Sequence, residues 1–129
     1  MRKKPTAPQA TEAQIQKAVI DLLAVHEAQG RLIYFAVPNG GRRDVVTAAN
    51  LKRLGVRAGV ADIVLLVPGM GDGNPYTIFW ELKTAKGSLS AEQKLFRNKV
   101  RAMGFTHAII RSADDALNEL RLWGVAPWA

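Results

Sequence analysis

Two apolar runs separated by a segment rich in glycine and proline constrain the fold of this chain most strongly. The runs are VADIVLLV at 60–67 and YTIFWELK at 76–83. Both are rich in β-branched and aromatic residues, which favour strands. The segment between them, PGMGDGNP at 68–75, is typical of a loop. The sequence therefore predicts an antiparallel β-hairpin with a long tip, whose strands lie at the centre of a sheet.

The rest of the chain alternates helical and strand patterns around this hairpin. Apolar residues recur at helical spacing in several segments, and two of these begin with the capping-box pairs Thr11/Gln14 and Ser90/Gln93. The predicted order is α, β, α, β, β, α, β, α, with helices over residues 11–29, 44–54, 90–103 and 112–123 and outer strands over residues 31–37 and 105–111.

This order predicts an α/β fold with a mixed sheet flanked by helices. The hairpin is antiparallel, while the strand–helix–strand step that follows should cross over to a parallel partner with the right-handed sense of such connections. At 129 residues and 48% hydrophobic composition, the chain is long enough for one domain with one core. We predict a single domain over residues 11–129, preceded by a disordered basic arm at residues 1–10.

The composition excludes several kinds of site. The chain has no cysteine, and its two histidines, His26 and His107, are too few for a usual zinc site. Both lie in apolar patterns and are expected to be core or boundary residues, so any metal must be held mainly by oxygen ligands. There is neither a run of about 20 apolar residues nor a secretory signal, which predicts a soluble, cytoplasmic protein without membrane contact.

The net charge favours a polyanionic partner. Eighteen Lys and Arg residues against eleven Asp and Glu residues give a formal charge of +7. Such an excess can bind nucleic acid by neutralising phosphates and releasing counterions. A charge that only solvates the surface is the alternative, so the positions of the charged residues matter more than their sum.

Three charged residues lie at the polar ends of the hairpin strands. Glu81 and Lys83 are two apart on one strand, so their side chains share a face about 6.6 Å apart. Asp62 starts the other strand, and antiparallel pairing brings that start beside Glu81. Adjacent carboxylates repel each other unless a cation lies between them, and a hard divalent cation such as Mg²⁺ or Mn²⁺ suits oxygen ligands. The alternative is a set of strand-end polar residues with a surface ion pair worth about 0–1 kcal/mol.

Two further residues are candidates for the same site. Glu12 lies three and seven residues before Ile15 and Val19 and is therefore expected on the buried face of the first helix, where an acid needs a partner. Favourable interaction with the helix dipole is the alternative. Gln93 either joins the site or only completes the capping box with Ser90. Carboxylates that hold a divalent ion, with a cation near the attacking water, are the parts that phosphodiester hydrolysis requires.

The chain resembles the VRR-NUC domain, the virus-type replication-repair nuclease branch of the PD-(D/E)XK superfamily, over residues 11 to about 120. The resemblance rests on Glu12, GVAD ending at Asp62, ELK at 81–83 and SAEQ ending at Gln93. VPNGGRR and LKRLGVRAGVAD are also similar to the family's stretch before the Asp. In one departure, Ala61 stands where the family's turn usually has Pro, which loosens the backbone but removes no ligand.

The resemblance implies a restriction-endonuclease-like fold and a Mg²⁺- or Mn²⁺-dependent endonuclease of DNA. It also implies that Glu12, Asp62 and Glu81 hold the metal, and that Lys83 and Gln93 complete the catalytic set. Stand-alone members of about this size are similar to dimeric Holliday-junction-resolving enzymes, so a homodimer that acts on branched or duplex DNA in DNA repair is expected. The alternatives are a non-catalytic DNA-binding module on the same fold and a hydrolase of small phosphoesters.

Polar and basic residues around the predicted site are candidates for phosphate contacts. For two arginines, Arg42 and Arg43, solvated loop charge is the alternative. Two tryptophans near the C-terminus, Trp123 and Trp128, are interpreted as cover for the sheet, with a dimer contact or stacking on unpaired bases as alternatives. The candidate DNA-binding residues are Asn39, Arg42, Arg43, Lys52, Arg53, Arg57 and Lys86.

Overall fold

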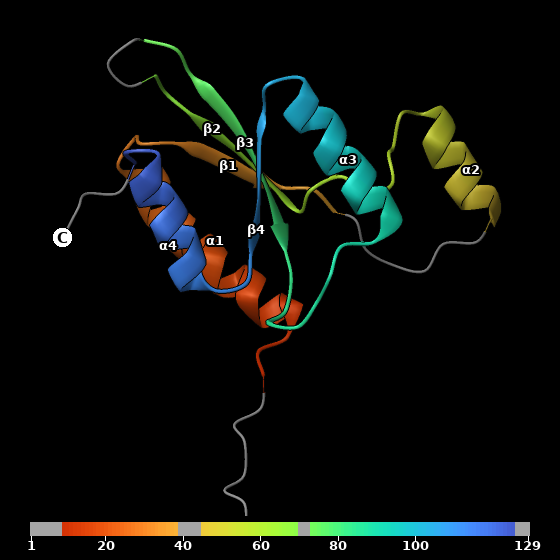
Figure 1. Ribbon diagram of the computed structural model, residues 1–129, viewed down its shortest axis with the longest axis horizontal. Helices are drawn as coiled ribbons and strands as arrows, with labels where there is room; N and C mark the ends of the chain where they lie inside the picture. Colours follow the sequence, from red (N-terminus) through yellow and green to blue (C-terminus); the bar gives the residue numbers. More distant parts are fainter. Residues whose placement is uncertain (1–8, 39–44, 70–72, 126–129) are drawn as a thin grey trace, which may run out of the picture.

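The computed structural model describes residues 9–38, 45–69 and 73–125. Most of the predicted arm at residues 1–10 therefore lies outside the described residues. Helices and strands follow one another in the predicted order (Figure 1). They are α1 (Glu12–Ala28), β1 (Ile33–Ala36), α2 (Val45–Arg53), β2 (Ile63–Val67), β3 (Tyr76–Leu82), α3 (Ala91–Ala102), β4 (Thr106–Ile110) and α4 (Ala113–Leu122).

The described strands form a four-stranded mixed sheet in the order β1-β2-β3-β4. β2 pairs antiparallel with β3, as the hairpin predicts, and β3 pairs parallel with β4, as the crossover through α3 predicts. β1 pairs antiparallel with the other side of β2. The predicted α/β fold with a mixed sheet is confirmed, and the two hairpin strands lie at its centre.

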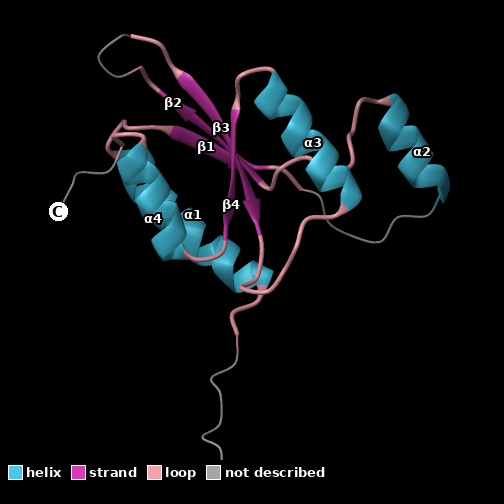
Figure 2. Ribbon diagram, in the orientation of Figure 1, coloured by secondary structure: helices cyan, strands magenta, loops and turns pink. Residues whose placement is uncertain are grey.

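Helices cover both faces of this sheet. Figure 2 shows α1 and α4 on one side and α3 on the other. On the side of α1 and α4, Leu23, Trp80 and Leu120 belong to one buried apolar core. On the α3 side, the ring of Phe79 packs edge-on against Phe96, with 5.4 Å between the ring centroids. Residues of β3 therefore alternate between a closed core and the face beneath α3.

One part of the α3 side remains open. Ile33 pairs with Leu66, and Phe35 shares the face of Ile33 because alternate residues of a strand point the same way. These three side chains are 56%, 41% and 47% exposed, in the order Ile33, Leu66 and Phe35. We call them the open strip, since they form an apolar surface on β1 and β2 that no described element covers.

The helix α2 lies at the edge of the molecule, away from the sheet (Figure 1). Its last residues, Lys52 and Arg53, are exposed, and Leu54 after it is 81% exposed. The two basic residues at the end of this helix are therefore open to solvent. None of the helices within the described ranges is long and apolar enough to cross a membrane.

The sequence predicts positions for two tryptophans near the C-terminus and for two histidines. Trp123 packs against Tyr76 beside the core, with 5.2 Å between the ring centroids, so its predicted role as cover for the sheet is confirmed. Trp128 lies outside the described residues. His26 and His107 are both buried, as expected of core or boundary residues.

Candidate functional site

The register of the central strands places two carboxyl groups opposite each other. β2 and β3 pair Ile63 with Trp80, and the Asp62 N–H donates to the carbonyl oxygen of Trp80 at 3.1 Å. Continuing this pairing by one residue sets Asp62 opposite Glu81, with both side chains on the α3 side of the sheet. The structure thus brings Asp62 and Glu81 together, as the hairpin predicts.

Asp62 is held firmly although the preceding residue, Ala61, lacks the backbone restraint of a proline. Its Oδ2 accepts a hydrogen bond from the N–H of Leu82 at 2.7 Å. Its carbonyl oxygen accepts another from the N–H of Val37 at 2.8 Å. Neighbouring strands on both sides therefore fix the backbone of Asp62, and Ala61 itself is buried. These bonds compensate for the rigidity that a proline would supply.

The carboxyl group of Glu81 is almost fully buried. The residue is only 1% exposed. Its Oε1 accepts a hydrogen bond from Nε2 of Gln93 at 2.6 Å. Its Oε2 is buried and has no hydrogen-bond partner among the described residues. Gln93 therefore occupies one carboxyl oxygen of Glu81, and the described residues leave the other available to a ligand.

The surroundings of Glu81 hold its carboxyl group in the neutral form. Burial is the largest cause, followed by the negative charge of Asp62, and together they raise the pKa of Glu81 to about 8. The positive charge of Lys83 opposes this rise in pKa, whereas the closeness of the Asp62 carboxyl group and the charge of Glu12 add to it. A cation beside the two acids would reverse this effect, because it favours the charged form of each carboxyl group.

Gln93 serves the helix end and the acid at the same time. Its Oε1 accepts the Ser90 N–H at 2.8 Å, and its own N–H donates to Oγ of Ser90 at 3.2 Å, which completes the capping box of α3. Because its amide oxygen is engaged in this way, its amide nitrogen faces Glu81. The Gln93 side chain therefore completes the capping box and also contacts Glu81, so a helix cap alone does not describe it.

Glu12 differs from its predicted placement. The expectation that it lies on the buried face of α1 is wrong, because its side chain is exposed, while Ile15 and Val19 further along the helix are buried. Its charge still reaches Glu81, since it contributes to the raised pKa of that residue. Within the described ranges, no three acidic or histidine side chains converge closely enough to hold a metal together. The close pair is Asp62 and Glu81, and Glu12 lies outside it.

Lys83 follows the last residue of β3 and is half-buried. Its N–H donates to the carbonyl oxygen of Ile110 at 3.1 Å, which extends the pairing of β3 with β4 by one residue. Its charge acts on Glu81, as the contribution to the pKa of that residue shows. Lys83 therefore belongs to the same group of charges as the two acids.

The donor set at this site fits a hard divalent cation. Asp62 and Glu81 supply carboxylate oxygens, which Mg²⁺ and Mn²⁺ prefer as ligands. The unpaired Oε2 of Glu81 is an oxygen for which the described residues supply no donor. Mg²⁺ is commonly bound through one or two carboxylates and keeps several water molecules, so a pair of acids is sufficient.

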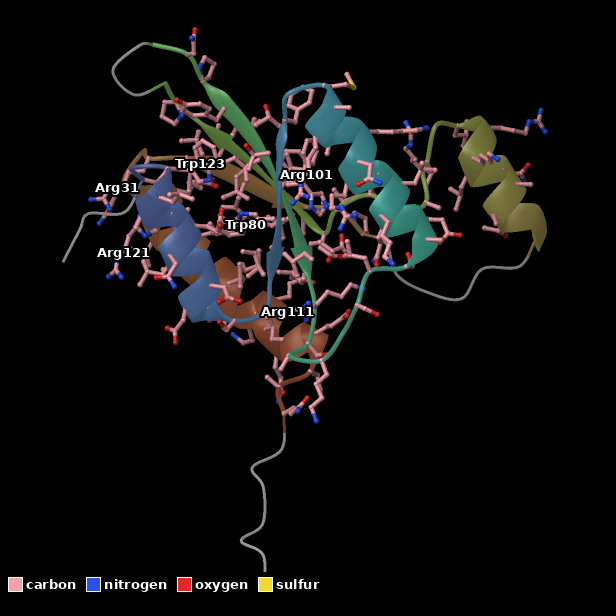
Figure 3. The ribbon with its side chains drawn as sticks, in the orientation of Figure 1. Arg31, Trp80, Arg101, Arg111, Arg121 and Trp123 are labelled. Atoms are coloured by element: carbon pink, nitrogen blue, oxygen red, sulfur yellow. The ribbon has the colours of Figure 1, made fainter. Side chains whose placement is uncertain are left out.

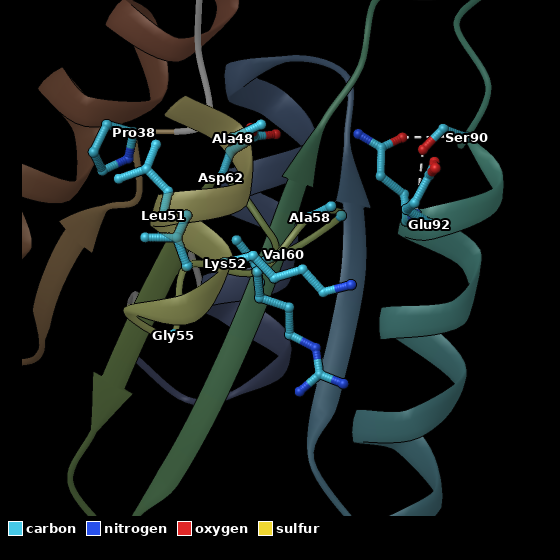
Figure 4. A pocket seen from close by; sticks show the side chains of 14 residues that line it. Pro38, Ala48, Leu51, Lys52, Gly55, Ala58, Val60, Asp62, Ser90 and Glu92 are labelled. Atoms are coloured by element: carbon cyan, nitrogen blue, oxygen red, sulfur yellow. Dashed lines mark hydrogen bonds between the residues drawn. The ribbon is translucent and has the colours of Figure 1, made fainter. Parts of the chain in front are cut away.

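A cleft of about 780 Å³ opens beside these residues (Figure 4). It lies between α2 and the first turn of α3, with the loop that leads from α2 to β2 between them. Asp62 and Gln93 line it, as do the predicted phosphate contacts Lys52 and Arg57. The apolar part of the wall comes from side chains such as Leu51 and Val60. The cleft therefore places two basic side chains, those of Lys52 and Arg57, near the edge of the candidate site.

The other predicted DNA contacts are distributed differently. Arg53 and Lys86 are exposed but do not line the cleft. The remaining three, Asn39, Arg42 and Arg43, lie outside the described residues. The structure thus gathers only part of the predicted set beside the site.

Two residues that shape the cleft were not predicted from the sequence. Gly59 has a φ of +78°, and a β-carbon there would collide with the backbone of Glu92 in the first turn of α3. Only a glycine allows this close approach, which joins the loop before Asp62 to α3. The side chain of Glu92 lines the cleft from the α3 side. The glycine of GVAD was the available signal, but it did not indicate its partner.

Comparisons with known proteins bear on the fold. No protein-family profile and no curated protein matches this sequence. A solved structure described as a VRR_NUC domain protein is similar, with a TM-score of 0.67 over 91% of this chain and 90% of that chain, at 18% sequence identity. The chain has the fold of a VRR-NUC domain. The fold implied by the VRR-NUC resemblance in the sequence is therefore confirmed.

The two capping boxes of this VRR-NUC fold allow a matched test of Gln93. Gln14 caps α1 with the same pair of bonds to Thr11 but does not contact Glu81. We expect Gln14→Ala to cost the free energy of one exposed hydrogen bond, about 0.5–1.5 kcal/mol. Gln93→Ala should cost about 1–3 kcal/mol more, because it also leaves a buried carboxyl oxygen unpaired. Equal losses in chemical denaturation would mean that the contact between Gln93 and Glu81 contributes nothing.

The raised pKa of Glu81 predicts how stability depends on pH in a chelator. The folded-state pKa is about 8, above the ordinary value of 4.5. Between these two values the unfolded chain ionises Glu81 while the folded chain keeps it protonated, so stability falls as pH rises from about 4.5 to about 8. Glu81→Gln, which stays neutral, should lack this loss. Denaturant titrations should show the stability of the wild type falling relative to that of Glu81→Gln as pH rises from about 4.5 to about 8, and parallel profiles of the two proteins would contradict the account.

Proposed function

We propose that this chain is an endonuclease that hydrolyses phosphodiester bonds in DNA, with Mg²⁺ or Mn²⁺ as its cofactor. One observation carries the proposal: the buried carboxyl group of Glu81 keeps an oxygen without a partner, directly opposite Asp62. A module that only bound DNA would gain nothing from acids beside the phosphates that they repel. The similarity in fold to a VRR_NUC domain protein supports the proposal.

The residues of the site would take distinct roles. When bound, the cation would lower the pKa of a water molecule and offset negative charge on the phosphate. Asp62 and Glu81 would hold the cation, and Gln93 engages one oxygen of Glu81, which leaves the other available. Lys83 would stabilise the oxygen of the attacking water molecule as that water loses its proton. Glu12, which is exposed, would support the site through water.

The cleft supports selectivity for branched DNA. Its volume of about 780 Å³ is that of a pocket for a small ligand, so a nucleotide of a separated strand would fit into it. Lys52 and Arg57 line it and would contact phosphates of the entering strand. Arg53 and Lys86 would contact the DNA outside the cleft. Junctions and flaps, including Holliday junctions, offer strands that separate in this way.

The proposal includes a homodimer. Cutting both strands of a junction requires two active sites, and this chain provides one set of candidate residues. The open strip of Ile33, Phe35 and Leu66 is an apolar surface that a second copy could cover around a two-fold axis. Self-association on this surface would place one active site on each side of the axis.

The direct test is cleavage of labelled duplex, single-stranded, flap and four-way-junction DNA in Mg²⁺ or Mn²⁺. We expect the wild type to cut junction or flap DNA and Glu81→Ala to cut none of these substrates. Lys83→Ala should lower the cleavage rate by a factor of about 10²–10⁴, because it removes the cation near the attacking oxygen. DNA affinity measured in a chelator should change little, since the overall basic charge is almost unchanged.

Lys17→Ala is a matched control for Lys83→Ala. Lys17 is an exposed lysine in a surface ion pair with Asp21 on α1, so its loss should leave cleavage unchanged. Tight DNA binding by the wild type without cleavage in either ion would favour the alternative, a binding module on the same fold. Cleavage by Lys83→Ala at the wild-type rate would show that the residues of the site are assigned wrongly.

A further inference from the structure

An arginine outside the predicted site ties the turn after the E-x-K motif to β4. Arg111, the residue after β4, donates from Nη1 to the carbonyl oxygens of Thr84 at 2.6 Å and Gly87 at 2.7 Å. A third carbonyl oxygen, that of Ala85, lies 3.4 Å from the same nitrogen. Figure 3 shows Arg111 at the end of β4, beside the connection from β3 to α3. Hydrogen bonds from a charged donor are among the stronger ones in proteins.

The segment that Arg111 holds is a tight turn. The N–H of Gly87 donates to the carbonyl oxygen of Thr84 at 3.1 Å, the bond between first and fourth residues that closes a β-turn. Arg111 bonds to the carbonyl oxygen at each end of this turn. Lys86, a proposed phosphate contact, is exposed within it. The guanidinium group therefore fixes both ends of the turn with respect to β4.

Arg111 is itself anchored in rigid structure. Its N–H donates to Oδ2 of Asp115 at 2.9 Å, and the N–H of Asp115 donates to Oγ of Ser112 at 3.0 Å, which caps α4. The preceding residue, Ile110, pairs with β3 and accepts the N–H of Lys83 at 3.1 Å. The donor thus comes from the end of a strand and the first turn of a helix, and both are fixed.

The turn lies against the side chain of Lys83. A β-carbon placed on Gly87 would be 3.5 Å from Cδ of Lys83, so this part of the lysine side chain lies next to the turn. A lysine side chain has many rotamers, and its ammonium group stays in one place only where the surroundings restrict them. The turn of residues 84–87 provides such a surface directly after Lys83 in the chain.

We infer that Arg111 is a positioning residue, which holds the turn of residues 84–87 and thereby keeps Lys83 in place beside Glu81. Its importance for cleavage rests on the proposed function, whereas its effect on Lys83 does not. Displacing a group of an active site by about 1 Å can lower a rate about 100-fold. The sequence gives no pattern for this role, because Arg111 and the turn lie far apart in the chain.

The test compares Arg111→Met and Arg111→Lys with a matched control. Arg111→Met keeps the apolar part of the side chain and removes its donors, while Arg111→Lys keeps a donor. Arg101→Met is the control, because Arg101 also donates to a backbone carbonyl oxygen, that of His107 at 2.9 Å, away from Lys83. Single-turnover cleavage and DNA affinity in a chelator are measured for each variant. NMR relaxation at Cε of Lys83 and hydrogen exchange at the Gly87 amide report on order without requiring catalysis.

We expect Arg111→Met to cleave about 10- to 100-fold more slowly. Its DNA affinity should stay within about twofold, because most phosphate contacts lie elsewhere. Arg111→Lys should recover part of the rate, and Arg101→Met should leave rate and affinity unchanged. Lys83 and the Gly87 amide should become more mobile in Arg111→Met and, to a smaller extent, in Arg111→Lys, but not in Arg101→Met.

Wild-type order at Lys83 in Arg111→Met would overturn the inference, as would unchanged cleavage in a variant whose turn has become mobile. If the wild type cleaves no DNA, the proposed function fails, and the NMR data alone decide whether Arg111 positions Lys83. If Arg111→Met does not fold, Arg111→Lys carries the same comparison, with a smaller loss of rate and of order expected.

Discussion

The candidate site depends on the burial of one carboxyl group. Glu81 lies on a central strand with a neighbouring strand on each side and α3 above it, so its side chain is almost fully buried. An acid in such a place is stable as a charged group only if a cation or several donors face it. The described residues supply one donor, from Gln93, and one nearby positive charge, from Lys83. Asp62, placed opposite by the strand register, makes the need for a cation greater.

Most of the structure around Glu81 can be understood as support for this arrangement. Backbone bonds to both neighbouring strands hold Asp62, and the capping box of α3 holds the amide group of Gln93. Gly59 lets the loop before Asp62 touch the first turn of α3, and both Gly59 and Glu92 line the cleft. The geometry of this buried acid is thus set by three local features that are common in proteins. They are a hairpin register, a helix cap and a glycine contact.

The features that could be predicted from the sequence are those set by residues close together in the chain. The two-residue period of the strands gave the hairpin, and the hairpin gave the meeting of Asp62 with Glu81. Capping-box spacing gave the starts of α1 and α3. Features that depend on how helices dock were not predictable in this way. Helical spacing placed Glu12 on the apolar face of α1, but the first turn of that helix is open to solvent.

The contacts of Gly59 and of Arg111 could not be predicted from the sequence for a similar reason. Each joins segments that are distant in the chain, and a single sequence carries no pattern for such pairs. The sequence also left two alternatives for Gln93, a helix cap or a residue of the site. The structure removes that choice, because the two ends of one amide group face different partners.

The most direct test of the central claim is thermal unfolding in increasing Mg²⁺ or Mn²⁺, for the wild type and for Asp62→Asn. A cation that binds the folded chain between Asp62 and Glu81 should raise the melting temperature of the wild type in proportion to the logarithm of its concentration. Asp62→Asn removes one carboxylate and should show little of this rise. Equal shifts in both proteins, or no shift in either, would contradict the account.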